Sequence, residues 1–274
     1  MTTPDHVIPS SGGVDVAVHE LGGEGPPLLL CHATGFHGRC WEPTARHLTD
    51  RYRCIAPDLR GHGDSPVPPE LELHWSGFAD DLLAVIDALD LGPVRAAGWS
   101  MGAAALVLAE QRRPGTIHSA FLFEPIIFPV LPTGPNPMAP GARKRREVFA
   151  SRDEAFDNYL GKGPFANADP AALHGYVEHG FSDRPDGSVI LKCRGEIEAQ
   201  VYEHHGHDAW DRLDELDVPL VLAMSGDGGR PAQLVPLLAE RVPGATLLRL
   251  DELTHMAPLE DPAAVAEAVA DAVG

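Results

Sequence analysis

The sequence alternates short apolar runs with helical patterns, and this rhythm constrains the fold more than any other feature. Short continuous apolar runs are typical of strands that are buried on both faces of a parallel sheet. Between two such runs, apolar residues recur at helical spacing from Phe78 to Leu89. This βαβ rhythm predicts an α/β fold with a doubly wound, mostly parallel sheet. The runs lie at residues 14–20, 27–31, 53–57, 94–98, 119–123, 219–224 and 245–250.

The rhythm stops between residues 126 and 215. This stretch opens with closely spaced prolines, carries the basic run Arg143-Lys144-Arg145-Arg146, and holds few strand-like runs apart from SVILKC at 188–193. We therefore predict a core domain made of residues 1–125 and 216–274. Residues 126–215 are predicted to form an inserted, mainly helical cap, and the basic run is interpreted as a solvated helix face.

The composition excludes several classes of partner. The formal net charge is −19, which opposes binding to phosphate backbones and to an anionic membrane surface. No apolar stretch approaches the roughly 20 residues that span a bilayer. We therefore expect a small-molecule substrate, with neither nucleic acid nor membrane as a partner, and the sequence leaves the oligomeric state open.

The N-terminal segment and the cysteines indicate the cellular compartment. The start of the chain, MTTPDHVIPSSGG, has neither a basic segment nor an apolar segment of a secretory signal. Its four cysteines show no C-x-x-C spacing, so neither a zinc site nor a disulfide framework is indicated. The HHGH segment at 204–207 has no recognisable ligand spacing and is interpreted as solvated. We expect a cytoplasmic protein without a metal or other cofactor.

The segment Gly98-Trp99-Ser100-Met101-Gly102 lies between a predicted strand and a predicted helix. The pattern G-x-S-x-G in that context is a nucleophile elbow, in which a strained turn lifts the serine hydroxyl above the sheet at a helix N-terminus. A serine nucleophile needs a base. His255, after the last predicted strand and before the last helix, occupies the place of the histidine in the chain order Ser, Asp or Glu, His.

These motifs make the chain resemble the α/β-hydrolase superfamily, in its capped branch of esterases, lactonases, C–C bond hydrolases and cofactor-free haloperoxidases. LLLCHATGF looks like the family's strand 3 and oxyanion segment, and RCIAPDLRGHGDS looks like its strand 4 exit loop. GWSMG and LTHM complete a match that covers residues 12–125 and 216–274 well and the cap only loosely. A serine at the elbow argues against the branches that use aspartate there.

The resemblance leaves two candidates for the acid that orients His255. Family members commonly carry the acid after strand 7, where this chain has Asp227 near the expected position. Other members carry it after strand 6, where this chain has Glu124. A carboxylate inside the apolar run FLFEPIIFPV is costly unless it is paired. We therefore predict Glu124 as the acid and keep Asp227 as the alternative.

The resemblance also implies an oxyanion hole and a substrate cleft. The donors would be the backbone N–H groups of Thr34 and Met101. The leading hypothesis is a serine hydrolase that cleaves a small ester or lactone through an acyl-enzyme. The alternatives are a C–C bond hydrolase and a non-hydrolytic member of the fold, such as a cofactor-free oxygenase, a lyase or a receptor. Candidates for contacting the substrate are Phe36, Trp99, Ile127, Phe128 and Met256.

Overall fold

The computed structural model describes residues 3–129, 134–204 and 207–274. In this part of the chain, eight strands form one sheet in the order β1-β2-β4-β3-β5-β6-β10-β11. Strand β2 runs antiparallel to the other seven strands of this sheet, since it pairs antiparallel with both β1 and β4 and the remaining pairs are parallel. The strands are β1 (His6–Pro9), β2 (Asp15–Gly22), β3 (Pro27–Cys31), β4 (Arg53–Pro57), β5 (Val94–Trp99), β6 (Ile117–Phe123), β10 (Leu220–Ser225) and β11 (Thr246–Leu250).

The central strands of the sheet are buried on both faces, as the continuous apolar runs predict. Along β3, Leu28 and Leu30 belong to one apolar cluster, and the alternate residues Leu29 and Cys31 belong to another. Successive side chains of a strand point to opposite faces, so a strand between two cores must be apolar throughout. All seven runs form strands of this sheet, which confirms the predicted fold class.

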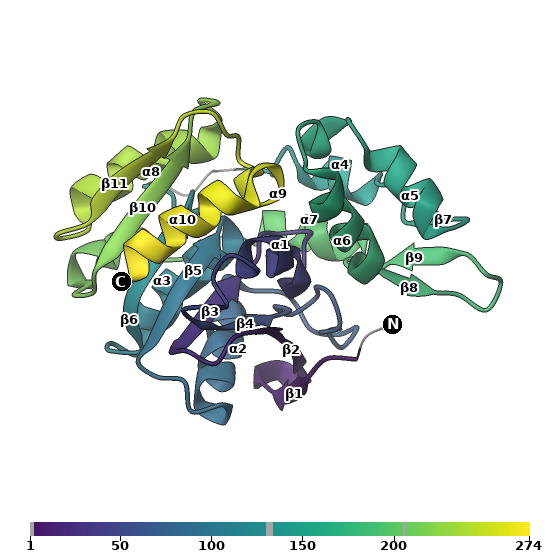
Figure 1. Cartoon of the computed structure of the whole chain (residues 1–274). Coiled ribbons are helices and arrows are strands. Elements are labelled where there is room, and N and C mark those ends of the chain that lie inside the picture. Colours follow the sequence, from purple (N-terminus) through teal and green to yellow (C-terminus); the bar gives the residue numbers. More distant parts are fainter. Residues whose placement is uncertain (1–2, 130–133, 205–206) are drawn as a thin grey trace.

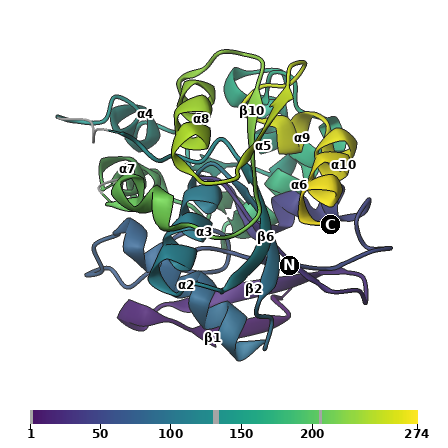
Figure 2. The same cartoon turned by 90° about the vertical axis from the view of Figure 1, so that its left-hand side faces the viewer.

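Helices cover both faces of the sheet (Figure 1, Figure 2). Residues of α2, α3 and α8 join the apolar cluster on one face, and residues of α10 and of the segment after α1 join the cluster on the other. None of the helices in the described part of the chain is long and apolar enough to cross a membrane. The helices of this unit are α1 (Glu42–Ala45), α2 (Trp75–Ala88), α3 (Met101–Arg112), α8 (Arg230–Arg241), α9 (Ala257–Glu260) and α10 (Pro262–Val273), with the 3₁₀ turns η1 (Ser11–Gly13) and η2 (Gly38–Trp41).

Most elements of the chain between β6 and β10, from α4 to β9, lie together at one end of the molecule (Figure 1). This part of the chain is not purely helical, because β7, β9 and β8 form a separate three-stranded sheet within the described residues. Residues 130–133 and 205–206 of the predicted cap lie outside the described residues. Its elements are α4 (Ala139–Arg143), β7 (Val148–Phe149), α5 (Arg152–Tyr159), η3 (Gly163–Phe165), α6 (Pro170–Gly180), β8 (Phe181–Asp183), β9 (Val189–Leu191), α7 (Gly195–Glu203) and η4 (Ala209–Glu215).

The return of the chain to the sheet occurs through η4. Ala209 and Leu213 of this turn are buried in the same apolar cluster as residues of α3 and α8. The last residues of the predicted insertion thus pack with the core. The division into core and cap at residues 126 and 215 stays a prediction.

Candidate active site

Ser100 occupies a strained turn between β5 and α3. Its backbone has φ 56° and ψ −111°, a conformation that a residue with a side chain rarely adopts. The two glycines of the motif are required by close packing. A β-carbon on Gly98 would lie 2.5 Å from Ala103 Cα, and one on Gly102 would lie 2.4 Å from the carbonyl oxygen of Cys31. The sequence G-W-S-M-G therefore places the serine where β5 ends and the helix begins.

Glu124 lies at the end of the neighbouring strand, directly after β6. It also has a positive φ, of 48°, and its side chain is fully buried. Its Oε1 accepts hydrogen bonds from the backbone N–H of Ser225, at 2.8 Å, and from the Ser225 hydroxyl, at 2.6 Å. Because β5, β6 and β10 are parallel neighbours, their carboxyl ends bring Ser100, Glu124 and Ser225 to one edge of the sheet.

His255 lies in the loop between β11 and α9, and its side chain is 23% exposed. Its Nδ1 makes a hydrogen bond with Oε2 of Glu124. The indole N–H of Trp99, the residue before Ser100, donates to the His255 carbonyl oxygen at 2.8 Å. The ring also packs near Trp99 and Phe123, with centroid distances of 6.2 and 6.3 Å. The loop that carries the imidazole is thus fixed against the elbow.

The alternative acid, Asp227, lies beside this contact without sharing it. Its carboxylate is exposed, and it accepts from the backbone N–H of Gly229 at 2.7 Å and of His255 at 3.4 Å. Burial acts to raise the pKa of Asp227, but the Gly229, Ser225 and His255 donors outweigh it and lower that pKa. Asp227 therefore faces the backbone of His255, whereas Glu124 faces its ring. Which acid serves the chemistry stays a prediction.

The described residues show no hydrogen bond between the Ser100 hydroxyl and the His255 ring. Catalytic hydrogen bonds are often long or poorly aligned before substrate binds. The structure brings the two residues to the same edge of the sheet through Trp99, and the contact between their side chains stays a prediction.

The predicted oxyanion donors lie on two adjoining segments. Thr34 lies in the loop after β3, and Met101 is the first residue of α3, where backbone N–H groups lack helical partners. Gly102 lets the start of the helix approach the end of β3 closely. His32 braces the loop, since its Nε2 accepts from the backbone N–H of Leu59 at 2.9 Å. Burial lowers the pKa of His32 to about 3, so the ring is neutral.

The predicted substrate contacts divide between the two faces of the sheet. Phe36 and Trp99 are buried with centroids 4.5 Å apart, and the half-buried Met256 packs against the same apolar cluster. Ile127 is buried in the cluster on the opposite face. The half-buried Phe128 lies under the guanidinium of Arg230, 5.3 Å from its ring centroid. The first three share one apolar cluster, and all five remain predicted contacts.

The basic run 143–146 forms ion pairs inside the inserted segment. Arg143 pairs with Glu196 and Glu203 of α7, and both contacts are solvent-exposed. Arg145 pairs with Glu198 at 2.6 Å, and its side chain is only 18% exposed. The prediction of a solvated helix face is therefore wrong for Arg145. Its guanidinium is buried because it pairs with the carboxylate of Glu198, which lies far away in the sequence.

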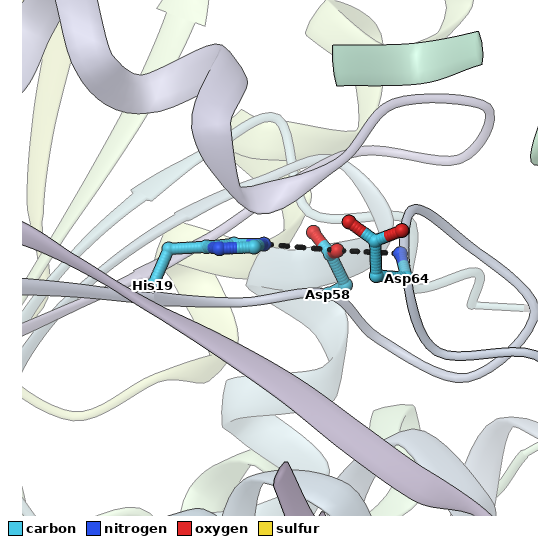
Figure 3. A group of neighbouring side chains, drawn as sticks. All are labelled: His19, Asp58 and Asp64. Carbon is cyan, nitrogen blue, oxygen red and sulfur yellow. Dashed lines mark hydrogen bonds and ion pairs between the residues drawn. The ribbon is translucent and has the colours of Figure 1, made fainter. Parts of the chain in front are cut away.

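One group of side chains has the composition of a metal site. One ligand atom from each of His19, Asp58 and Asp64 lies within 4.8 Å of the others (Figure 3). These groups already have partners. Asp58 accepts from His19 Nε2 at 3.0 Å and from the Asp64 backbone N–H at 2.7 Å, and the Lys192 ammonium lies 2.7 Å from the Asp64 carboxylate. Burial acts to raise the pKa of Asp58, but His19 lowers it well below its usual range.

The histidines of the HHGH segment bind backbone carbonyls. His204 Nδ1 lies 2.8 Å from the carbonyl oxygen of Leu73, and His207 Nε2 lies 3.2 Å from that of Ile126. His205 lies outside the described residues. The described members of this segment thus connect the end of α7 to neighbouring loops.

We expect activity to be indifferent to metal removal. Lys192 and the backbone donors occupy the oxygens of the His19, Asp58 and Asp64 group, so a cation would have to displace them. The measurement is hydrolysis of an ester after treatment with EDTA and desalting, with and without added zinc or manganese. A loss on chelation that one of these metals restores would contradict the prediction.

The sheet order, the elbow after β5 and the histidine after the last strand define the class of this protein: it has the fold of an α/β hydrolase. The model of the alpha/beta hydrolase family matches residues 28–268, and the chain belongs to that family. The predicted resemblance is thereby confirmed. The protein is a hydrolase.

Several relatives are known by name. The chain is 36% identical to a pimeloyl-[acyl-carrier protein] methyl ester esterase of Methylococcus capsulatus, over 86% of this chain and 90% of the relative. An enzyme of the same name from Aeromonas hydrophila is 24% identical over 92% of this chain and 97% of that one. The solved structure of E-2-(acetamidomethylene)succinate hydrolase matches with a TM-score of 0.78 at 22% identity, covering 98% of this chain and 99% of that chain. This last likeness concerns the fold alone.

Proposed function

We propose that the protein is a carboxylic ester hydrolase that works through an acyl-enzyme. The observation that carries the proposal is the hydrogen bond between the fully buried carboxylate of Glu124 and Nδ1 of His255, beside the strained turn of Ser100. An ionised carboxylate at Nδ1 keeps the proton on that nitrogen and leaves Nε2 free to accept one. Ser100 is the proposed nucleophile, His255 the base and Glu124 the acid.

The reaction would proceed in two halves. Ser100 Oγ attacks the ester carbon while His255 Nε2 takes its proton, and the imidazolium then donates that proton to the leaving alcohol. A water molecule, deprotonated by the same nitrogen, releases the acid and regenerates the serine. The N–H groups of Thr34 and Met101 would hold the oxyanion formed in each half.

The proposed substrate is a small ester with an apolar acyl or alcohol part. The aromatic pair of Phe36 and Trp99, with Met256 beside it, would contact that part. Methyl esters are the first class to test, because the relative from Methylococcus capsulatus is named a methyl ester esterase. Lactones are the next class, since they react through the same acyl-enzyme.

The proposed compartment is the cytoplasm. The four cysteines are buried as free thiols, which fits a reducing environment. The net charge of −19 supports a small molecule rather than nucleic acid as the partner.

We expect a fluorophosphonate probe to label the protein at Ser100. The probe phosphonylates serines that a neighbouring base activates, so ordinary surface serines stay unlabelled. Intact-mass measurement should show a single addition, and peptide mapping should place it in the elbow. Ser100→Ala should abolish labelling. Absence of labelling in the folded wild-type protein would contradict the proposed acyl-enzyme at Ser100.

A further inference from the structure

Ser225, the last residue of β10, lies between the two candidate acids. It is fully buried, and its hydroxyl lies 2.6 Å from Oε1 of Glu124 and 2.9 Å from Oδ1 of Asp227. With the Glu124–His255 contact, the groups form a chain from solvent to the proposed base: Asp227, Ser225, Glu124, His255. Sequence reasoning did not single out Ser225, although it directly precedes the Gly226-Asp227 segment.

The two donors of Ser225 fix the orientation of the Glu124 carboxylate. Both the backbone N–H and the hydroxyl bind Oε1, which leaves Oε2 for the imidazole. The position of the catalytic acid therefore depends on a residue from a neighbouring strand. A hydrogen bond to an ionised carboxylate also reduces the negative charge that it presents to its other partners.

The hydroxyl of Ser225 has one hydrogen and two carboxylate oxygens within reach. A hydroxyl donates one hydrogen bond, so Glu124 and Asp227 compete for it. The shorter distance favours donation to Glu124. Asp227 is ionised at neutral pH, because its donors lower its pKa. Asp227 acts in two ways. It competes with Glu124 for the hydrogen of the Ser225 hydroxyl, and its negative charge lies next to the backbone N–H of His255.

We propose that Ser225 is a positioning residue for Glu124, and that Asp227 tunes the protonation of His255 through it. The inference rests on the proposed function, since it concerns the acid of that triad. Other charged groups nearby have partners of their own. Arg249 at the end of β11 pairs with Asp251, Glu260 of α9 accepts from Thr254, and Arg230 of α8 lies over the Phe128 ring.

The two substitutions predict shifts of opposite sign. Ser225→Ala removes a donor from Glu124, so the carboxylate presents more negative charge and stabilises the imidazolium. The acid limb of the kcat/KM profile should then move up by about half a pH unit, because the base must be neutral to act. Asp227→Asn removes a negative charge near His255 and the competitor for the hydroxyl, so the limb should move down by a similar amount.

The experiment measures kcat/KM against pH with p-nitrophenyl butyrate, and the titration of the His255 ring by NMR without substrate. Ser225→Ala should also lower kcat roughly 10- to 100-fold through misplacement of Glu124. Ser225→Cys keeps a donor, although a weaker one on a somewhat larger side chain, and is expected to fall between alanine and wild type. It also replaces Ser225→Ala as the test if the alanine variant does not fold.

Two matched control variants remove a buried serine hydroxyl and an exposed aspartate charge at other places in the fold. Ser119→Ala deletes a buried hydroxyl of β6 that donates to the Val273 carbonyl, and Asp217→Asn deletes an exposed charge before β10, at the opposite end of that strand from Asp227. Neither should move the acid limb. A limb and an NMR midpoint that stay fixed in the Ser225 and Asp227 variants, or move in the same direction in both, would overturn the inference.

The outcome separates this inference from the proposed function. If Ser100→Ala loses activity while the Ser225 and Asp227 variants leave the limb fixed, the hydrolase proposal stands and the inference fails. If Ser100→Ala retains activity, the triad proposal fails and the inference fails with it.

Discussion

Ser100→Ala is expected to lower kcat by about 10³- to 10⁶-fold and to leave the fold intact. The hydroxyl is the proposed nucleophile, and the methyl group of alanine cannot take its place in acyl transfer. The fold should survive because the turn is held by backbone groups. The Ser100 N–H donates to the Phe123 carbonyl at 2.8 Å, and the Ser100 carbonyl accepts from Ala104 at 3.1 Å. Alanine keeps both of these bonds.

The test compares steady-state ester hydrolysis with thermal unfolding of the same preparations. Ser119→Ala serves as a control, since it also deletes a buried hydroxyl at the sheet but lies at the opposite end of β6 from Glu124. It should hydrolyse esters at close to the wild-type rate. Ester hydrolysis that survives in Ser100→Ala at such a rate would refute the proposed mechanism.

Glu124→Gln is expected to reduce the acylation rate by about 10³- to 10⁴-fold with little change in thermal stability. Glutamine has the same volume, and its oxygen can still accept from the Ser225 N–H and hydroxyl. Its amide N–H₂ then faces Nδ1 of His255, where the carboxylate was. The imidazole must present a lone pair there, so its proton moves to Nε2 and the ring cannot accept a proton from Ser100.

Asp227→Asn is the comparison that separates the two acids. It also keeps volume and removes charge, but it leaves the contact between Glu124 and the His255 ring in place. We expect its loss of acylation rate to stay below about tenfold. Single-turnover kinetics at the optimal pH measure the step directly. A severe loss in Asp227→Asn together with an active Glu124→Gln variant would assign the acid to Asp227.

The sheet could be predicted because its strands are encoded locally. PLLLC is apolar at every position, and RCIAP is apolar after Arg53, since both sides of these strands are buried beyond their half-buried first residues. The edge strand β1 was not predicted, because it is too little buried to carry an apolar run. It has four residues, of which only Ile8 is buried, so its sequence carries no continuous apolar signal.

The part of the candidate active site that could be predicted is the part encoded in one short segment of the sequence. Gly98 is required by close packing against the start of α3 and Gly102 by close packing against the end of β3, so the elbow can be identified from five residues. Ser225 could not be found in this way. Its role depends on contact with Glu124, about a hundred residues earlier in the chain, across neighbouring strands. The pairing of Arg145 with Glu198 likewise joins residues that no local pattern connects.

The positive φ angles of Ser100 and Glu124 have a consequence for engineering this protein. Each such residue costs about 1–3 kcal/mol of folding free energy, and glycine would relieve that cost. A selection for heat resistance alone would therefore favour glycine at Ser100, whereas glycine at Glu124 would leave the buried donors of Ser225 without their acceptor. The replacement at Ser100 would remove the side chain that the proposed reaction needs, so thermostability and turnover are expected to trade off at the end of β5.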